Sequence, residues 1–145
     1  MSHFHPNRPL RLETDAAQSK GLGYALWQQQ ENGDWKLLQT GSRFVTPTEA
    51  RYSATEVEML AVCWAIGKCR TFLIGSTFEL VVDHRPLISI INSKTLDEVD
   101  NPRLQRMKEK LSPSRIHAVW RAAAKHTVVD VFSRHPVSDP EQKDI

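Results

Sequence analysis

The sequence predicts a single α/β domain, because segments with the pattern of β-strands alternate with segments in which apolar residues recur at helical spacing. Two of the strand-like segments end on an aspartate, Asp15 and Asp83. In a sheet flanked by helices, such residues lie at the carboxyl edge of the sheet, where ligands bind. A length of 145 residues suits one domain with a full hydrophobic core.

Five segments are expected to form strands. Residues 10–15 alternate apolar and polar side chains, and residues 22–27 and 35–40 follow after turn-forming residues. We expect these three strands to form an antiparallel meander. Residues 80–82 are a short apolar run that stops at Asp83, and Pro86 prevents its continuation. Residues 116–120 are the last predicted strand.

Helices are expected between and after these strands. Ser53 and Glu56 have the spacing of a capping box, and apolar residues then recur at helical spacing. Residues 87–91 predict a short helix, whereas residues 92–100 are polar and typical of a loop. Asn101 and Pro102 have the pattern of a helix start. The predicted buried stripe of that helix is Leu104, Met107 and Leu111. Residues 127–133 predict a last helix.

Four carboxylates are candidates for a functional site: Asp15, Glu58, Asp83 and Asp130. Glu58 lies ~200° around the helix from Glu56, at the margin of the apolar face, where a carboxylate has no local structural purpose. Three of the four, Glu58, Asp83 and Asp130, also have a structural explanation. Glu58 could reach solvent with its long stem, and Asp83 or the neighbouring His84 could cap the next helix. Asp130 fits a second capping box.

Four like charges gathered in one cleft repel each other unless cations lie between them. Oxygen ligands without cysteine favour magnesium or manganese. Two such ions ~4 Å apart would activate a water molecule and stabilise the leaving oxygen of a phosphodiester. This chemistry requires a substrate that contains phosphate.

A basic segment follows an acidic one, although the net charge is only +2. The cations between Asn101 and Lys125 are Arg103, Arg106, Lys108, Lys110, Arg115, Arg121 and Lys125. On a helix, Arg103, Arg106 and Lys110 share one side, whereas Lys108 points elsewhere. The segment is either a surface that binds phosphates or an ordinary solvated helix face.

The cysteines and the apolar runs indicate the compartment. Cys63 and Cys69 lie on one predicted helix, which places their α-carbons ~9 Å apart, too far for a disulfide. We expect two structural thiols in a reducing compartment. No apolar run approaches the ~20 residues of a membrane span, and the first residues lack the apolar core of a signal peptide. We therefore expect a protein that is neither secreted nor membrane-bound.

Six motifs, in order along the chain, resemble a known family. They are LETDA (residues 12–16), GSR with TPTE (41–49), YSATEVEMLAV (52–62), DHRPL (83–87), NPRLQR (101–106) and VVDVFSR (128–134). Together they resemble the ribonuclease H domain that follows the polymerase in gypsy-type long-terminal-repeat retrotransposons. The resemblance covers residues 8–136, so residues 1–7 and 137–145 are expected to be tails or linkers. It implies a ribonuclease H-like fold: a mixed five-stranded sheet, with an antiparallel meander of strands 1–3, then parallel strands 4 and 5, and helices on both faces.

The resemblance also implies a function. The family members are metal-dependent endonucleases that hydrolyse the RNA strand of RNA/DNA hybrids during reverse transcription, with two Mg²⁺ ions, for which Mn²⁺ can substitute. Asp15, Glu58, Asp83 and Asp130 match the catalytic and metal-binding carboxylates. The candidates for nucleic-acid binding are Arg43, His84, Arg103, Arg106 and Lys110. The implied partners are the hybrid and an upstream reverse transcriptase polymerase domain. The implied location is a cytoplasmic virus-like particle, or the nucleus.

Three departures from the family pattern leave alternatives open. Ala122, Ala123 and Ala124 replace a Pro-Gly-Lys turn, and alanine replaces glycine poorly where φ is positive. His126 replaces an asparagine and is either an auxiliary residue or an ordinary loop histidine. Ser114 replaces an aromatic residue. The chain could therefore be a weakened module that binds hybrid or packs against a polymerase. A third hypothesis is another nuclease of the same superfamily, such as an integrase or resolvase.

Overall fold

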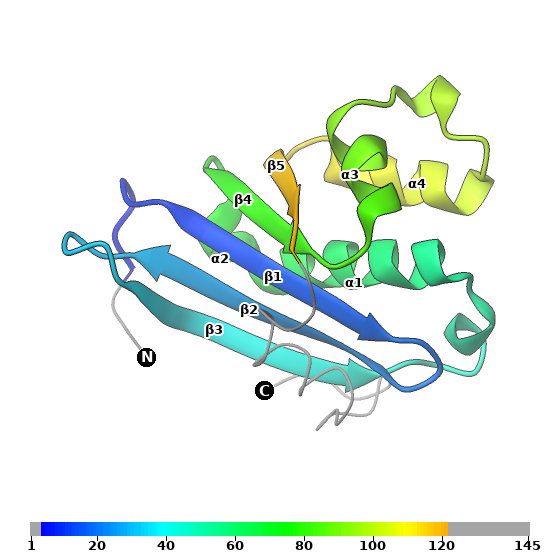
Figure 1. The fold of residues 1–145 in the computed structure, drawn as a ribbon, viewed down its shortest axis with the longest axis horizontal. Coiled ribbons are helices and arrows are strands. Elements are labelled where there is room, and N and C mark those ends of the chain that lie inside the picture. Colours follow the sequence, from blue (N-terminus) through cyan, green and yellow to red (C-terminus); the bar gives the residue numbers. More distant parts are fainter. Residues whose placement is uncertain (1–3, 122–145) are drawn as a thin grey trace.

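A mixed five-stranded sheet forms the framework of the protein (Figure 1). The structure, a computed structural model, describes residues 4–121. The strands are β1 (Leu10–Ala17), β2 (Gly21–Gln29), β3 (Trp35–Phe44), β4 (Thr77–Val82) and β5 (Arg115–Trp120). Their order is β3-β2-β1-β4-β5, in which β1, β2 and β3 pair antiparallel and β4 pairs parallel with both β1 and β5. The predicted meander and the two parallel strands are confirmed.

Helices pack against this sheet and against each other. They are α1 (Ala54–Lys68), α2 (Arg70–Leu73), α3 (Arg85–Asn92) and α4 (Pro102–Leu111), with short 3-10 turns η1 (Glu49–Arg51) and η2 (Leu96–Glu98). Helix α1 crosses β1 and β2, α4 packs on α1, and α3 lies beside β5 (Figure 1). The helix predicted at 127–133, with Asp130, and the tail after residue 136 lie outside the described residues.

The core lies between the sheet and α1, and it sets the register of β1. Leu12 is fully buried and pairs with Leu26 on one side and Leu80 on the other. These side chains pack with Met59 and Val62 of α1. A slip of one residue would turn every side chain of β1 to the opposite face. The buried leucines therefore also determine where Asp15, three residues further along β1, lies.

Helix α1 begins at the predicted capping box. Ser53 Oγ accepts a hydrogen bond from the Glu56 amide at 3.2 Å, and Glu56 Oε1 accepts one from the Ser53 amide at 2.8 Å. Both orphan amides at the helix start are satisfied in this way. Because the cap determines which residue opens the helix, it also determines which face carries Glu58.

The structure departs from the sequence-based expectations in several places. Cys69, expected on the same helix as Cys63, lies between α1 and α2. Strand β3 continues to Phe44, so that Gly41, Ser42 and Arg43 belong to the sheet. The stretch 92–100, expected to be a loop, contains η2, which starts with a capping box between Thr95 and Glu98. Thr95 and Glu98 have the same spacing as Ser53 and Glu56. Because no apolar residues at helical spacing follow them, the sequence did not predict a helical turn here.

The chain has two cysteines, Cys63 and Cys69. Both are free, and burial raises the pKa of Cys63 to about 11 and that of Cys69 to about 12. Thiols with such pKa values are poor nucleophiles and poor metal ligands at neutral pH. Among the described helices, none is both long and apolar enough to cross a membrane.

We expect Ser53→Ala to lower the free energy of unfolding by ~1 kcal/mol, because the substitution removes the hydroxyl that accepts a hydrogen bond from the Glu56 amide. Urea denaturation followed by circular dichroism measures this change. Ser112→Ala, at the exposed C-terminal end of α4, is the matched control and should change stability by less than ~0.5 kcal/mol. Equal losses in both variants would contradict the assignment of the cap.

Candidate functional site

Three of the predicted carboxylates come from three different elements that meet at one edge of the sheet. Asp15 lies near the end of β1, and Asp83 directly follows the last residue of β4. Strands β1 and β4 are parallel, and Glu13 pairs with Val81. Asp15 and Asp83 lie two residues after this pair in the chain, so the parallel register places both at the carboxyl edge of the sheet. Helix α1 contributes Glu58.

The environment of Glu58 relates it to both aspartates. Its side chain is buried, and its Oε2 atom has no hydrogen-bond partner. Burial, and then the charges of Asp15 and Asp83, raise the pKa of Glu58 to about 8. Both aspartates therefore lie within electrostatic range of Glu58. The hypothesis that Glu58 reaches out into solvent is wrong, since only 9% of the residue is exposed.

Glu56, two residues earlier, has the opposite environment. Hydrogen bonds lower its pKa to about 2, first from the Ser53 backbone amide and then from the side chains of Asn101 and Arg103. The distances to Glu56 Oε2 are 3.1 Å from Asn101 Nδ2 and 3.0 Å from Arg103 Nη1. Glu56 is therefore a fully bonded structural carboxylate, as the capping box predicted, and Glu58 is a carboxylate without a partner on Oε2.

Asp83 does not cap the helix that follows it. The residue at the N-cap position of α3 is His84, and its side chain makes no capping hydrogen bond. His84 Nε2 instead lies 2.8 Å from the hydroxyl of Thr55, in the first turn of α1. The structural explanation of Asp83 as a helix cap is therefore wrong. Burial lowers the pKa of His84, although the charge of Asp83 opposes this effect.

Arg43 is engaged inside the protein. Its guanidinium forms two hydrogen bonds with Glu49, of 2.8 and 3.0 Å, and both side chains are largely buried. Glu49 also accepts a hydrogen bond from the Thr46 amide at 2.9 Å. This bidentate pair fastens the end of β3 to the segment that leads into α1. Arg43, predicted to bind nucleic acid, thus has a structural partner for its guanidinium.

The basic segment of α4 divides into bonded and exposed cations. Arg103 pairs with Glu56 and lies over the ring of Tyr52 at 4.3 Å. Lys108 donates hydrogen bonds to the carbonyls of Ile90 and Ile91, at 2.6 and 3.3 Å, at the end of α3. Arg106 and Lys110, by contrast, are exposed. The prediction that Lys108 points away from the others agrees with these contacts.

The three carboxylates Asp15, Glu58 and Asp83 have donor atoms that fit a divalent cation. Their donor atoms are carboxylate oxygens, which hard cations prefer, and one buried oxygen of Glu58 has no other partner. Within residues 4–121, however, no group of three or more His, Cys, Asp or Glu side chains is arranged to hold a metal ion. Asp130, the fourth predicted carboxylate, and His126 lie outside this part of the chain.

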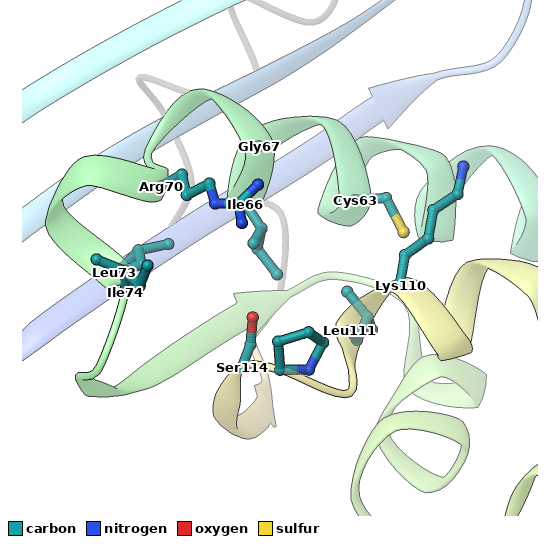
Figure 2. A pocket seen from close by; sticks show the side chains of 10 residues that line it. Cys63, Ile66, Gly67, Arg70, Leu73, Ile74, Lys110, Leu111 and Ser114 are labelled. Atoms are coloured by element: carbon teal, nitrogen blue, oxygen red, sulfur yellow. The ribbon is translucent and has the colours of Figure 1, made fainter.

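A pocket of about 270 Å³ lies elsewhere, toward the opposite end of α1 (Figure 2). Its walls include Ile66 of α1, Leu73 of α2 and Leu111 of α4, and Cys63 lines it as well. None of the candidate carboxylates lines this pocket. It is therefore separate from the carboxylate site.

The sequence did not indicate that Thr55 and Trp120 contact the residues next to Asp83. Trp120 ends β5 and lies against the guanidinium of Arg85, whose central carbon is 4.0 Å from the ring centroid. Thr55 contacts a histidine 29 positions away in the chain. No periodicity or local motif predicts contacts between residues so far apart in the chain.

We expect the stability of the protein without metal to depend on pH through Glu58. The pKa of this group is raised from 4.5 to about 8 by folding, so the unfolded chain ionises first as pH rises. The free energy of unfolding should therefore fall between about pH 4.5 and pH 8, by at most ~1.4 kcal/mol per pH unit. Denaturation in EDTA at several pH values measures this slope.

Two variants separate Glu58 from the other groups. Glu58→Gln should flatten the slope and be more stable than the parent protein at pH 8. Glu56→Gln is the control with the opposite sign, because the lowered pKa of Glu56 contributes stability above pH 4.5 that is lost as pH falls toward 2. An unchanged slope in Glu58→Gln would show that Glu58 is ionised and solvated in the folded protein.

Comparison with known proteins gives a consistent family. Residues 5–113 match the model of the "RNase H-like domain found in reverse transcriptase". The chain is 28% identical over 130 residues to the Pol polyprotein of the transposon opus of Drosophila melanogaster. It is 30% identical over 128 residues to that of the transposon gypsy of the same organism. These alignments cover 89% and 88% of the chain, but the chain spans only 12% and 11% of the two polyproteins.

Solved structures show the same fold. The LC11-RNase H1 in complex with an RNA/DNA hybrid superimposes with a TM-score of 0.66 at 14% identity, covering 88% of this chain and 96% of that one. The foamy viral protease-reverse transcriptase in complex with an RNA/DNA hybrid gives a TM-score of 0.58 at 16% identity, covering 97% of this chain and 17% of that one. The predicted ribonuclease H-like fold is confirmed. From the family match, the relatives and the fold together, we conclude that this chain belongs to the family of RNase H-like domains found in reverse transcriptases.

Proposed function

We propose that this chain is a metal-dependent endonuclease that hydrolyses the RNA strand of RNA/DNA hybrids. One observation carries the proposal: a buried glutamate with a partnerless oxygen and a raised pKa lies in the field of two aspartates. Such a cluster is electrostatically unfavourable in a protein without metal, and perturbed carboxylates of this kind are typical of functional sites. The similarity to an RNase H1 solved with an RNA/DNA hybrid supports the choice of substrate.

The residues proposed to hold two Mg²⁺ ions, or Mn²⁺ in their place, are Asp15, Glu58, Asp83 and Asp130. Divalent cations at such a site supply Lewis acidity: they make a bound water nucleophilic and stabilise charge on the leaving oxygen. The chain's own part is to present carboxylate oxygens from β1 (Asp15), from α1 (Glu58) and from the turn that follows β4 (Asp83). With its pKa raised to about 8, Glu58 would carry a proton at neutral pH in the protein alone, and it would have to lose that proton to hold a cation.

The exposed cations of α4 are proposed to contact the phosphates of the hybrid. Arg106 and Lys110 are four residues apart, so they lie on one side of the helix, and both are exposed. Arg103 is half-exposed and is already paired with Glu56. Its main part in our proposal is to neutralise Glu56 and tie α4 to the start of α1. Arg43 and His84, which have protein partners, are proposed to line the substrate without free charges of their own.

The wider setting is also a proposal. The polyprotein relatives are about eight times longer than this chain, in keeping with a reverse transcriptase polymerase domain upstream. We propose that residues 8–136 form the nuclease domain, with 1–7 and 137–145 as tails or linkers. The place of action that fits such a polyprotein is a virus-like particle in the cytoplasm, or the nucleus.

We expect Asp15→Asn, Glu58→Gln and Asp83→Asn each to abolish cleavage of a labelled RNA/DNA hybrid in Mg²⁺. Each substitution removes an anionic ligand, yet relieves repulsion in the cluster, so the folded protein should be as stable as the parent or more stable. The matched control is Glu56→Gln, which keeps an acceptor for the Ser53 amide and should retain most activity. An inactive Glu56→Gln beside an active Glu58→Gln would reverse the two assignments.

The same assay distinguishes the alternatives. Binding of hybrid without cleavage by the parent protein would show a binding module. Cleavage of duplex DNA but not of hybrid would show a different nuclease of the superfamily. Circular dichroism of each variant separates loss of chemistry from loss of fold.

We expect Arg106→Ala combined with Lys110→Ala to weaken hybrid binding and to lower the salt dependence of the affinity by about two phosphate contacts. Fluorescence anisotropy at several salt concentrations measures this slope. Lys36→Ala, an exposed lysine near the start of β3, is the matched control and should leave the slope unchanged. An unchanged slope in the double variant would mean that α4 presents an ordinary solvated face.

A further inference from the structure

The turn that carries Asp83 is not held by its own helix cap. Val82 is the last residue of β4, Arg85 is the first residue of α3, and His84 makes no side-chain capping bond. Val82 and Leu87 are fully buried and anchor the backbone on either side of the turn. The short segment 83–86 between them therefore needs other contacts to fix its direction.

One contact ties this turn to the helix that carries Glu58. His84 Nε2 lies 2.8 Å from Thr55 Oγ1. Thr55 and Glu58 are three residues apart on α1, so they lie on neighbouring positions of one helix face. The hydrogen bond thus couples the residue after Asp83 to the helix face that presents Glu58.

A second contact ties the other end of the turn to β5. The guanidinium carbon of Arg85 lies 4.0 Å from the centroid of the Trp120 ring. Trp120 is paired with Val82 in the parallel ladder, and the Arg121 amide donates to the Val82 carbonyl at 2.9 Å. Trp120 is 42% exposed, so it contributes less to the hydrophobic core than a buried tryptophan would.

We propose that Thr55 and Trp120 are positioning residues that hold the Asp83 turn from two sides and so direct the Asp83 carboxylate toward Glu58. The inference rests on the proposed function, in which both carboxylates bind metal. Neither residue touches substrate or metal in this scheme. Side chains that orient metal ligands commonly affect metal affinity by 10–100-fold when they are removed.

The test uses a disruptive and a conservative variant at each position. Thr55→Val removes the hydroxyl and keeps the shape, whereas Thr55→Ser keeps the hydroxyl. Trp120→Leu removes the aromatic ring, whereas Trp120→Phe keeps a ring for Arg85. Thr40→Val is the matched control, because the Thr40 hydroxyl also donates a hydrogen bond, to the Tyr24 carbonyl at 2.7 Å, but from β3.

Three measurements on the full chain are needed. Calorimetric titration with MgCl₂ gives the Mg²⁺ affinity without any substrate. Amide hydrogen exchange gives the protection of the Leu87 amide, which donates to the His84 carbonyl at 3.1 Å and reports on the turn without any metal. Cleavage at increasing Mg²⁺ then shows whether a saturating concentration restores the rate.

We expect Thr55→Val and Trp120→Leu each to weaken Mg²⁺ binding by roughly 10-fold and to lower Leu87 protection. Thr55→Ser and Trp120→Phe should restore both, and Thr40→Val should alter neither. Loss of stability with unchanged Mg²⁺ affinity and unchanged Leu87 protection would overturn the proposal. If the parent protein binds no Mg²⁺ or cleaves no hybrid, the proposed function fails. Unchanged Leu87 protection would then still refute the positioning role.

Discussion

The burial of Glu58 beside two aspartates is the constraint on which the rest of the site depends. A carboxylate that leaves water loses hydration, and like charges nearby add to that cost. The protein relieves both effects by keeping Glu58 protonated, with a pKa of about 8. Side chains on flexible loops would move apart to escape such repulsion. The carboxylates stay together because β1, β4 and α1 are fixed by packing of the core.

The polar contacts around the site mainly hold those elements in place. The pair between Glu56 and Arg103 ties the start of α1 to α4, and the pair between Arg43 and Glu49 ties β3 to the segment before α1. Arg43 and Arg103, which the sequence motifs indicate as nucleic-acid-binding residues, thus also hold the elements around the site in place. Removing one partner of such a pair leaves the other polar group unsatisfied, which destabilises more than the pair itself contributes.

Much of this arrangement could be predicted from local patterns. The capping box at Ser53 separated Glu56 from Glu58 because the spacing of the box and the helical period are both local properties. The places of Asp15 near the end of β1 and of Asp83 directly after β4 followed from strand patterns that reach a carboxylate. The turn η2 was missed because no apolar periodicity follows its capping box, and the length of β3 was missed because its last residues pair with β2 about twenty positions earlier in the chain. Asp130 and His126 stay predictions, since they lie outside the described residues.

The sequence by itself indicated the five strands, the helices α1, α3 and α4, the caps at Ser53 and Asn101, and the candidate carboxylates, since these patterns depend on neighbours within a few positions. It also indicated the family, through six ordered motifs. Only the tertiary structure decided that Glu58 is buried without a partner on Oε2, and that Arg103 is bound to Glu56. It also decided that Thr55 and Trp120 flank the Asp83 turn. Such contacts join residues 29 or more positions apart. Their geometry depends on how the sheet and helices pack, which no local pattern encodes.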